Sequence, residues 1–500
     1  MPEGIDLADL LAGILPEVPR GIEVFDVTAD SRRVTPGGLF LALPGLTSHG
    51  VEHAAEAAAR GARALLWEPT RGLDAPRLPA GMPAYAIPGL RQHAGTIADR
   101  FFASPSEALV IAGITGTNGK TTCAHLIAGA LEAHGWRGAY SGTLGFGPVS
   151  ALQPVTHTTP DCVTVHRQLG ALRDAGQKFV GMEVSSHALD QHRVAGVRFH
   201  TAVFMNLTRD HLDYHGTLEA YGAAKARLFA WPGLEQCVIN FDDPFGRELA
   251  GRIADDVAVT AIWTDPRREE AIGEHFFRAR EVRPRRSGLE LHFAGSRGSG
   301  VIRSQLIGGF NAENLLAALG VLTGWGMPLA DAVGALAACT PPPGRMETFG
   351  AGPDQPLVVV DYAHTPDALR KALKALRRHT SGRLFCVFGC GGDRDPGKRP
   401  MMGAIAEEIA DVVVVTDDNP RNEDPARIVA GIRRGMQEPK TARVLHDREV
   451  AIRTALSEAR PEDAVLVAGK GHEDYQIVGR EIRPLSDRAI VRAALGGARR

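Results

Sequence analysis

The sequence predicts an α/β protein of three domains, with mostly parallel sheets in the central and C-terminal domains. Apolar runs of strand length alternate with longer helical patterns along nearly the whole chain. Such alternation is typical of parallel sheets with right-handed crossovers. The 500 residues also exceed the ~250–300 at which a single core stops growing. We place the domains at residues 1–90, 91–340 and 341–500.

Composition and charge exclude several classes of function. With 44% hydrophobic and 23% charged residues, the chain has the composition of an ordinary globular protein. A net charge of −2 provides no general field for nucleic acid or an anionic membrane. The acidic N-terminus, with Glu3, Asp6 and Asp9, does not resemble a signal peptide, and no stretch approaches the ~20 apolar residues that span a bilayer. We therefore expect a cytoplasmic protein with no nucleic-acid partner and no membrane insertion.

Six scattered cysteines fit neither a disulfide scaffold nor a zinc site. Cys386 and Cys390 are close in sequence, but Cys386 lies in an apolar run. We expect it to be a buried strand residue rather than a metal ligand.

The first domain alternates short strands with turns. Apolar runs at 22–27, 38–43 and 64–67 predict strands, and an Ala-rich segment at 51–60 predicts a helix. Two turns, at 29–32 and 45–50, are unusually small and polar. On turn chemistry alone they are as well explained by local structure as by a binding site.

The central domain opens with a glycine-rich loop. An apolar strand at 108–114 leads into G-T-N-G-K-T-T at 116–122, and a helix follows at 123–134. Glycines turn the backbone N–H groups inward, and the helix N-terminus and Lys120 add positive charge. The concavity suits a nucleoside triphosphate, with the Thr121 hydroxyl able to reach Mg²⁺. An ordinary Gly-rich turn between strand and helix is the plainer alternative.

The rest of the central domain continues the alternation. Polar clusters at 183–187 and 206–215 follow predicted strands, and ligands gather at the carboxyl ends of parallel strands. The pattern at 276–307 predicts antiparallel strands, and P-P-P-G at 341–344 predicts a linker. The further predicted strands are 179–184, 201–206 and 236–240, and the helices are 91–102, 218–229, 311–325 and 329–339.

Three side chains of this domain are candidates for a metal-assisted reaction. Glu183 and His211 follow apolar strands, so that with the Thr121 hydroxyl they could hold Mg²⁺ against phosphate. Lys225 lies on the Ala-rich helix at 218–229, and its spacing alone favours a solvated side chain.

The last domain repeats the α/β pattern and reads as Rossmann-like. Polar clusters again follow its strands, at 361–364, 391–395, 417–421 and 469–473. The predicted strands are 357–361, 383–389, 411–416 and 464–468, and the helices are 366–378, 398–409, 425–436 and 447–459.

Seven motifs occur in the order found in one family. They are G-T-N-G-K-T-T, M-E-V-S-S-H, N-L-T-R-D-H-L-D-Y-H, N-A-E-N-L, P-G-R-M-E, D-Y-A-H-T-P and D-N-P-R. Together they make the chain resemble the Mur ligases of peptidoglycan synthesis over nearly its whole length. The resemblance implies an N-terminal UDP-binding domain, a central P-loop ATPase domain and a C-terminal domain that binds the incoming amino acid. We also expect a monomer.

The resemblance further implies ATP-dependent amide formation through an acyl phosphate, with two Mg²⁺ sites. Lys120, Glu183, His211 and Lys225 would be catalytic, and Lys225 would carry a CO₂-derived carbamate, which reverses the expectation from spacing. Thr121, Glu183, His211 and Lys225 would hold metal. ATP would contact Gly116, Thr117, Asn118, Gly119, Lys120, Thr121, Thr122, Asn311, Arg345 and Asp361.

The implied acceptor is UDP-MurNAc-L-Ala-D-Glu. Its contacts carry over to Ala29, Ser31, Leu46, Thr47, Ser48, His157, Thr158, Thr159, Ser185, Gln191 and Arg193. The chain departs from the family pattern at His157, where Asn is frequent, and in residue type at 46–48.

The implied amino acid is meso-diaminopimelate, which differs from L-lysine by a second carboxylate. Arg421 of the D-N-P-R motif offers that carboxylate a bidentate pair, which an L-lysine side chain cannot use. Glu473 would take the distal amine. The expected pocket residues are Arg394, Asp418, Asn419, Pro420, Arg421, Gly469 and Glu473.

Three alternatives remain at this point. An L-lysine-adding Mur ligase differs only in the amino-acid pocket. A folylpolyglutamate synthetase-like ligase shares the organisation of the ATP-binding domain. A non-catalytic nucleotide-binding scaffold would not need Glu183, His211 and Lys225 together.

Overall fold

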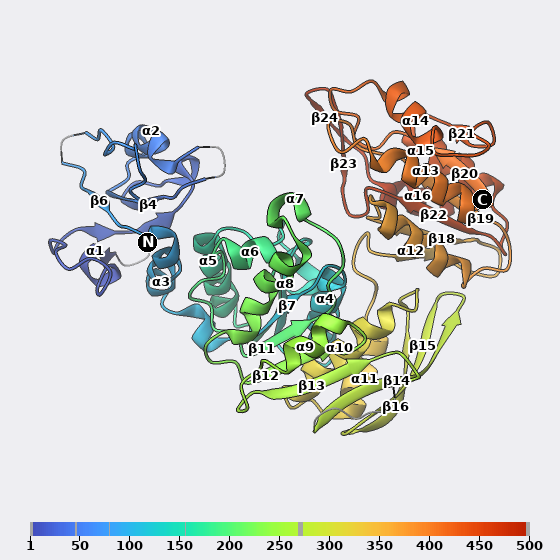
Figure 1. Ribbon diagram of the computed structural model, residues 1–500, viewed down its shortest axis with the longest axis horizontal. Helices are drawn as coiled ribbons and strands as arrows, with labels where there is room; N and C mark the ends of the chain where they lie inside the picture. The colour runs from blue at the N-terminus through green and yellow to red at the C-terminus, as the bar shows by residue number, and fades with distance from the viewer. Residues whose placement is uncertain (1–3, 46–47, 80, 156, 269–273, 497–500) are drawn as a thin grey trace. The chain divides into compact units, whose positions relative to one another are not determined.

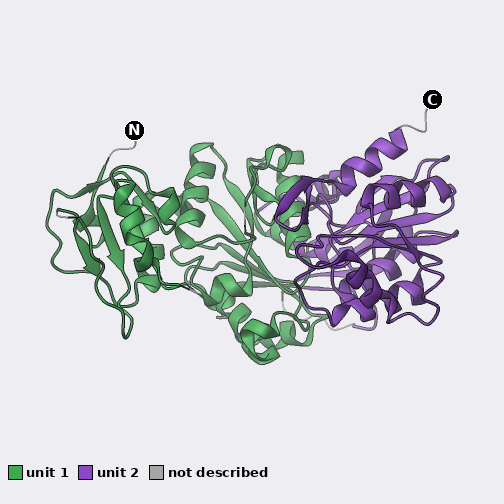
Figure 2. Ribbon diagram, turned by 90° about the horizontal axis from the view of Figure 1, so that it is seen from above, with its two compact units in different colours: residues 1–261, 273–275, 320–325 green, residues 262–272, 276–319, 326–500 purple. Residues whose placement is uncertain are grey.

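The computed structural model describes residues 4–45, 48–79, 81–155, 157–268 and 274–496, and the chain divides into two compact units. The first consists mainly of Met1–Ala261, and the second mainly of Phe276–Leu319 and Gly326–Arg500 (Figure 2). Among the described residues, no helix combines the length and apolar character that crossing a bilayer requires.

The N-terminal part of the first unit is a small sheet with helices. Strands β3 (Asp26–Thr28), β4 (Gly38–Ala42), β5 (Ala64–Trp67) and β6 (Ala84–Ala86) pair in that order, all parallel. Every residue of β4 and β5 is buried, which explains their uninterrupted apolar sequences. The predicted helix at 51–60 is shorter, because a 3₁₀ turn, η2 (Gly50–His53), precedes α2 (Ala54–Ala59). The smaller elements are β1 (Ile5–Asp6), α1 (Leu7–Leu10), β2 (Glu23–Val24) and η1 (Ser31–Arg33).

The central sheet of the first unit has the order β13-β12-β11-β7-β10-β8-β9, of which Figure 1 labels β13, β12, β11 and β7. Strands β12, β11, β7, β10 and β8 are mutually parallel, and β9 runs antiparallel to β8. The predicted strands are confirmed within two residues at each end, whereas β8, β9 and β13 were not predicted. The strands are β7 (Val110–Thr115), β8 (Gly138–Gly142), β9 (Gly145–Gly147), β10 (Phe179–Glu183), β11 (Thr201–Phe204), β12 (Gln236–Asn240) and β13 (Ala258–Trp263).

Helix α4 (Lys120–Ala133) packs very closely on this sheet. A Cβ at Gly181 of β10 would lie 2.7 Å from the Ala124 carbonyl oxygen, so only glycine fits there. This contact fixes the helix directly behind the glycine-rich loop that precedes it. The other helices are α3 (Leu90–Phe101), α5 (Cys162–Asp174), α6 (Ser186–Asp190), α7 (Leu212–His215), α8 (Leu218–Ala226) and α9 (Pro244–Ala250), with 3₁₀ turns η3 (Pro105–Ala108), η4 (Val149–Ala151) and η5 (Arg227–Ala230).

The second unit begins with the predicted antiparallel excursion. Strands β14 (His275–Arg285), β15 (Gly288–Gly295) and β16 (Gly298–Ser304) form a meander. Helices α10 (Asn311–Gly324) and α11 (Leu329–Ala338) follow within one residue of their predicted bounds.

The C-terminal sheet has the order β17-β18-β22-β19-β20-β21, parallel except for β17. Alternate residues of β18 face two separate cores: Val359 packs with Leu369 and Met402, and Val358 packs with Ile452 and Val491. Helices therefore cover both faces, as the Rossmann-like prediction requires. The strands are β17 (Glu347–Gly350), β18 (Leu357–Asp361), β19 (Leu384–Phe388), β20 (Val412–Val415), β21 (Arg443–Val444) and β22 (Ala464–Ala468).

A hairpin that the sequence did not reveal follows β22. Strands β23 (Tyr475–Val478) and β24 (Glu481–Pro484) pair antiparallel before the last helix.

Cys386 is a buried residue of β19, as expected. The helices are α12 (Pro366–Arg377), α13 (Lys398–Ile409), α14 (Pro425–Arg433), α15 (Arg448–Glu458) and α16 (Asp487–Gly496).

Candidate active site

The glycine-rich loop joins β7 to α4 and is braced by the loop after β11. Gly116 and Gly119 have φ angles of 154° and 88°, which L side chains rarely adopt. The Asn206 carbonyl accepts from the N–H of Thr117 at 2.8 Å, and the Asn206 side chain accepts from the N–H of Asn118 at 2.8 Å. Lys120 begins α4. The loop, the helix N-terminus and Lys120 thus form a cationic cradle suited to phosphate.

Within this cradle the Lys120 ammonium is held by the loop itself. Its Nζ donates to the carbonyl oxygens of Gly116 at 2.8 Å and Thr117 at 2.9 Å. These contacts fix the position of the charge at the loop. Thr122, the last loop residue that is expected to contact ATP, lies in the first turn of α4.

Glu183, at the end of β10, is a buried carboxylate surrounded by neutral donors. It is 1% exposed and accepts from the Thr121 hydroxyl at 2.9 Å and the Thr143 N–H at 2.9 Å. The Tyr140 hydroxyl of β8 donates to Oε1 of Glu183, the oxygen that also accepts the Thr143 N–H, whereas Thr121 donates to Oε2. Within the described chain, every hydrogen bond to this carboxylate comes from an uncharged group. A buried carboxylate without a cationic partner is well suited to a metal ion.

Lys225 is also buried, at 1% exposed, so the interpretation from its spacing is wrong. Its Nζ donates to the Gly116 carbonyl at 2.9 Å and lies 4.3 Å from the centroid of the Tyr221 ring. The small neighbours on α8 allow the helix to approach the loop closely enough for this contact. Burial, reinforced by the charge of Lys120, holds the pKa of Lys225 well below its usual range.

His211 lies apart from the Thr121–Glu183 pair, at the start of α7. It has a φ of 51°, and its half-exposed imidazole lies 3.5 Å from an Asp210 oxygen. Its ring packs against His187, with centroids 4.9 Å apart. Burial and the neighbouring histidines lower the pKa of His187 to about 4. Among the described residues, no group of three or more His, Cys, Asp or Glu side chains is arranged to hold a metal ion.

A pocket of about 670 Å³ opens beside this region, between the small sheet and the central sheet. Four of the expected acceptor contacts, Ala29, His157, Gln191 and Arg193, line it. Its other lining residues are Leu43, Pro44, Gly45, Arg91, Asp161, Cys162, Asp190 and Tyr214.

A hydrogen-bond chain runs along one wall of this pocket. Arg193 donates to the Thr159 carbonyl at 2.9 Å and to the Gln191 side-chain oxygen at 2.7 Å. Gln191 in turn donates to the Tyr214 hydroxyl at 3.0 Å, which donates to Asp190 at 2.8 Å. The chain fixes a half-buried guanidinium in a concave wall, where it can meet an anionic group.

The same wall is linked to Glu183. The Thr159 hydroxyl donates to the Glu183 carbonyl at 2.9 Å, and the hydroxyls of Thr158 and Thr143 lie 3.0 Å apart. Ser185 caps α6 by accepting from the Ala188 N–H at 3.1 Å. Expected contacts with the acceptor therefore adjoin the expected metal-binding carboxylate.

Two expected contacts near the small sheet do not line the pocket. Ser31 is buried and donates to Glu56 at 2.7 Å, and Ser48 is exposed. Leu46 and Thr47 lie outside the described residues.

In the second unit, Arg345 and Asp361 flank the start of the C-terminal sheet. The guanidinium of Arg345 lies 4.6 Å from the centroid of the Tyr362 ring, and its buried Nε has no hydrogen-bond partner within the described chain. Asp361 accepts from the backbone N–H groups of Met346 at 2.8 Å and Ala363 at 3.1 Å, and burial raises its pKa. Asn311, at the start of α10, donates to the Ile307 carbonyl at 2.8 Å.

The D-N-P-R loop after β20 is held in an unusual backbone conformation. Arg421 has a φ of 51°, in the left-handed region. Its N–H donates to the Ile477 carbonyl at 3.0 Å, and its carbonyl accepts from the Gly479 N–H at 2.7 Å. Its guanidinium donates to the Gly392 carbonyl at 2.9 Å. The β23–β24 hairpin thus maintains the strained residue and directs its side chain toward the loop after β19.

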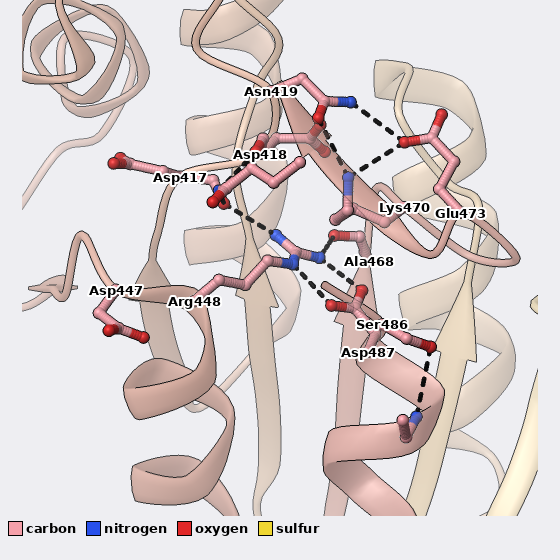
Figure 3. Close-up of polar contacts among 12 residues, drawn as sticks. Asp417, Asp418, Asn419, Asp447, Arg448, Ala468, Lys470, Glu473, Ser486 and Asp487 are labelled. Carbon is pink, nitrogen blue, oxygen red and sulfur yellow. Dashed lines mark hydrogen bonds and ion pairs between the residues drawn. The ribbon is translucent and has the colours of Figure 1, made fainter. Parts of the chain in front are cut away.

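The loop after β22 lies beside the D-N-P-R loop (Figure 3). A Cβ at Gly469 would lie 2.5 Å from a carboxylate oxygen of Asp418, and Gly469 has a φ of 117°. Glu473 accepts from the Asn419 amide at 3.1 Å and from Lys470 at 3.1 Å. Asp418, Asn419, Gly469 and Glu473 are therefore brought together, whereas Arg394 is an exposed residue of the loop after β19.

Sequence reasoning missed several side chains of these sites. Tyr140 was overlooked because β8 is short and rich in glycine, and Arg91 and Tyr214 carry no motif signal of their own. Lys470 was part of a named polar cluster, and its position directly after a buried strand was the signal that could have identified it.

Three segments of the chain match descriptions of one family. Residues 23–101 match the Mur ligase family catalytic domain, residues 114–322 the Mur ligase middle domain, and residues 344–471 the Mur ligase glutamate ligase domain. A UDP-N-acetylmuramoyl-L-alanyl-D-glutamate–2,6-diaminopimelate ligase of Pseudomonas aeruginosa is 49% identical over 474 residues, 95% of each chain.

Solved structures of other proteins share the fold. A structure of a UDP-N-acetylmuramoyl-L-alanyl-D-glutamate–2,6-diaminopimelate ligase is similar over 100% of both chains, with 35% identity and a TM-score of 0.72. Mycobacterium tuberculosis folylpolyglutamate synthase, complexed with ADP and AMPPCP, shares the fold with 22% identity and a TM-score of 0.59, over 76% of this chain and 92% of its own.

Proposed function

The chain belongs to the Mur ligase family, and we propose that it is the ATP-dependent ligase that joins meso-diaminopimelate to the D-glutamate γ-carboxylate of UDP-MurNAc-L-Ala-D-Glu. The observation that carries this proposal is the pair of adjoining loops after β20 and β22. They present a fixed cation, Arg421, and a fixed carboxylate, Glu473. Diaminopimelate has a second carboxylate and a distal ammonium to match them, whereas L-lysine has only the ammonium. The reaction would serve cytoplasmic peptidoglycan precursor synthesis.

ATP bound at the glycine-rich loop would supply the energy of the reaction. A carboxylate is a poor electrophile, so the γ-phosphoryl group of ATP passes to the γ-carboxylate oxygen and ADP leaves. The amine of diaminopimelate then attacks the carbonyl carbon of this acyl phosphate, loses a proton and expels phosphate. The Lys120 ammonium, fixed by two loop carbonyls, is placed to stabilise charge on the transferring phosphoryl group.

Magnesium would neutralise phosphate charge during this transfer. Thr121 and Glu183 fit it, because their oxygens lie 2.9 Å apart in a buried site whose donors are otherwise neutral. His211 and Lys225 complete the proposed ligand set for two ions. Tyr140 and Thr143 would orient the carboxylate.

The burial of Lys225 supports the proposed carbamate. Only an unprotonated amine adds to CO₂, and the lowered pKa of Lys225 favours that form. The nitrogen attacks the carbon of CO₂ and loses a proton, which converts a buried cation into an anion. That anion would oppose Lys120, whose positive charge now disfavours a protonated Lys225.

The pocket of about 670 Å³ is the proposed site of the UDP-linked acceptor. Arg193, held by Thr159 and Gln191, supplies a positive charge to an anionic ligand. The remaining expected acceptor residues would contact the ligand through the small sheet and the Thr158–Thr159 segment. Arg345, Asp361 and Asn311 are also proposed to contact ATP.

Two further parts of this reading are proposals. We propose domains at 1–90, 91–340 and 341–500; the three matched segments, 23–101, 114–322 and 344–471, support the number of domains, and the first of them extends past residue 90. We also propose that the protein acts as a monomer on small-molecule substrates alone.

One assay tests the function. Phosphate release from ATP is measured with UDP-MurNAc-L-Ala-D-Glu present, together with meso-diaminopimelate, L-lysine or no amino acid. We expect release that requires both substrates and strongly prefers diaminopimelate. Equal activity with L-lysine would favour the lysine-adding alternative, and activity only with a folate and glutamate would favour the folylpolyglutamate alternative. No release in any combination would refute the ligase.

A further inference from the structure

Lys470 is a completely buried lysine at the meeting point of two loops. Its side chain is 0% exposed, and the residue lies two positions after the end of β22. Its Nζ donates to the side-chain oxygen of Asn419 at 3.2 Å and to Oε2 of Glu473 at 3.1 Å, as Figure 3 shows. The ring of Tyr475 lies 5.4 Å from the ammonium. A buried ammonium is costly unless its partners are well arranged, so the arrangement itself needs an explanation.

The contacts of Lys470 form a closed triangle. Asn419 donates its amide to Oε2 of Glu473 at 3.1 Å, the same oxygen that accepts from Lys470. No hydrogen bond from the described part of the chain reaches the second oxygen, Oε1 of Glu473. The carboxylate is therefore fixed through one oxygen, while the other remains available to a ligand.

The triangle rests on a rigid base. Arg448 and Asp487 are fully buried and joined by two hydrogen bonds, of 2.7 and 2.8 Å. Arg448 also donates to the Ala468 carbonyl at 2.9 Å, at the end of the strand that precedes Lys470. Helices α15 and α16 and the end of β22 are thus clamped together below Lys470 (Figure 3).

The triangle also connects to Arg421. The side-chain oxygen of Asn419 accepts from the Ile477 N–H at 2.9 Å as well as from Lys470. The carbonyl of Ile477 accepts the N–H of Arg421 at 3.0 Å. A single buried ammonium therefore helps to place both groups that would distinguish diaminopimelate from L-lysine.

We infer that Lys470 is a positioning residue that sets the preference for an amino acid with a second carboxylate, an inference that rests on the proposed function. It fixes Oε2 of Glu473 so that Oε1 meets the distal ammonium, and through Asn419 it holds the loop that carries Arg421. Its charge also offsets that of Glu473. A ligand with a second carboxylate can pair with Arg421, whereas L-lysine cannot.

The test replaces Lys470 by methionine, which keeps the length of the side chain and removes its charge. We expect the KM for diaminopimelate to rise about 10- to 100-fold, as for the loss of hydrogen bonds to a charged group. The KM values for ATP and for the UDP-linked acceptor, and kcat, should change by less than ~3-fold, because those sites do not contact Lys470. The ratio of kcat/KM for diaminopimelate to that for L-lysine should fall.

The matched control is Lys371→Met, on α12. Lys371 is half exposed and pairs with Asp367 at 2.8 Å, one turn earlier on the same helix. Such surface pairs contribute little, so the control should keep all three KM values. An unchanged KM for diaminopimelate in Lys470→Met, with an active wild type, would overturn the inference alone. A wild type without diaminopimelate-dependent turnover would instead refute the proposed function.

A second variant controls for misfolding of Lys470→Met, which removes the cationic partner of the partly buried Glu473 carboxylate. Lys470→Met/Glu473→Gln removes both charges of the pair and is compared with Glu473→Gln alone. If Lys470 acts through Glu473, the double variant and Glu473→Gln should have the same preference for diaminopimelate over L-lysine within ~3-fold. Effects that simply multiply would overturn the inference.

Discussion

The hydroxyl of Thr121 donates to the carboxylate of Glu183 at 2.9 Å, although 62 positions separate the two residues in sequence. Thr121 lies in the first turn of α4, and Glu183 is the last residue of β10. The parallel pairing of β7 and β10 brings the glycine-rich loop and this carboxylate to the same edge of the sheet. The groups proposed to bind phosphate and those proposed to bind the metal are therefore parts of one structure.

Removal of the Thr121 hydroxyl should weaken magnesium binding. Thr121→Val keeps the shape of the side chain but leaves Glu183 without one of its donors. We expect the half-saturating Mg²⁺ concentration to rise about 10-fold or more, from the loss of a hydrogen bond to a charged group. A magnesium titration of phosphate release measures this. An unchanged magnesium requirement would argue against the proposed site.

Replacement of Lys225 should abolish activity in a recoverable way. Lys225→Ala removes the proposed carbamate and leaves space beside Gly116, whose carbonyl accepts from Lys225 at 2.9 Å. We expect a loss of about 10²-fold or more in kcat and partial recovery with short carboxylic acids, which can occupy that space. The assay is phosphate release with and without such acids. Full activity of Lys225→Ala without them would exclude the carbamate.

Arg421→Ala should selectively lose diaminopimelate addition. A buried ionic mismatch of this kind corresponds to about a 10³-fold preference. We expect kcat/KM for diaminopimelate to fall by about that factor while ATP binding persists. Arg427→Ala, on the exposed side of α14, is the control and should have no effect. Equal losses for L-lysine and diaminopimelate would count against recognition by Arg421.

His125 should make the protein sensitive to acid. This buried residue of α4 has no hydrogen-bond partner at Nδ1 within the described chain, and burial lowers its pKa from 6.5 to about 4. The unfolded chain therefore binds the proton more readily, so stability is full above pH 6.5 and falls as the pH drops toward 4. The cost at low pH is about 3 kcal/mol.

The variant that checks this is His125→Leu. Its thermal midpoint should depend less on pH between 6.5 and 4 than that of the wild type. His53→Gln, at an exposed position, should retain the wild-type dependence. Identical pH profiles for His125→Leu and the wild type would show that other groups control the acid transition.

Most elements of the fold and the positions of their loops could be predicted from the sequence alone. Buried parallel strands such as β18 and β22 have nearly continuous apolar sequences, and their predicted bounds are those observed. The glycine-rich loop and the D-N-P-R motif were also recognisable, because their chemistry lies in neighbouring residues. The strand order was not, since β22 returns to lie between β18 and β19 and apolar runs do not encode that choice.

Only the tertiary structure decided which side chains meet. The burial of Lys225, the donation from Tyr140 to Glu183 and the triangle of Lys470, Asn419 and Glu473 depend on contacts between segments far apart in sequence. Strand order brings those segments together, and continuous apolar strands do not encode that order. The physical reason is that periodicity determines which face of an element is buried, whereas the partner across that face depends on the packing of the whole chain.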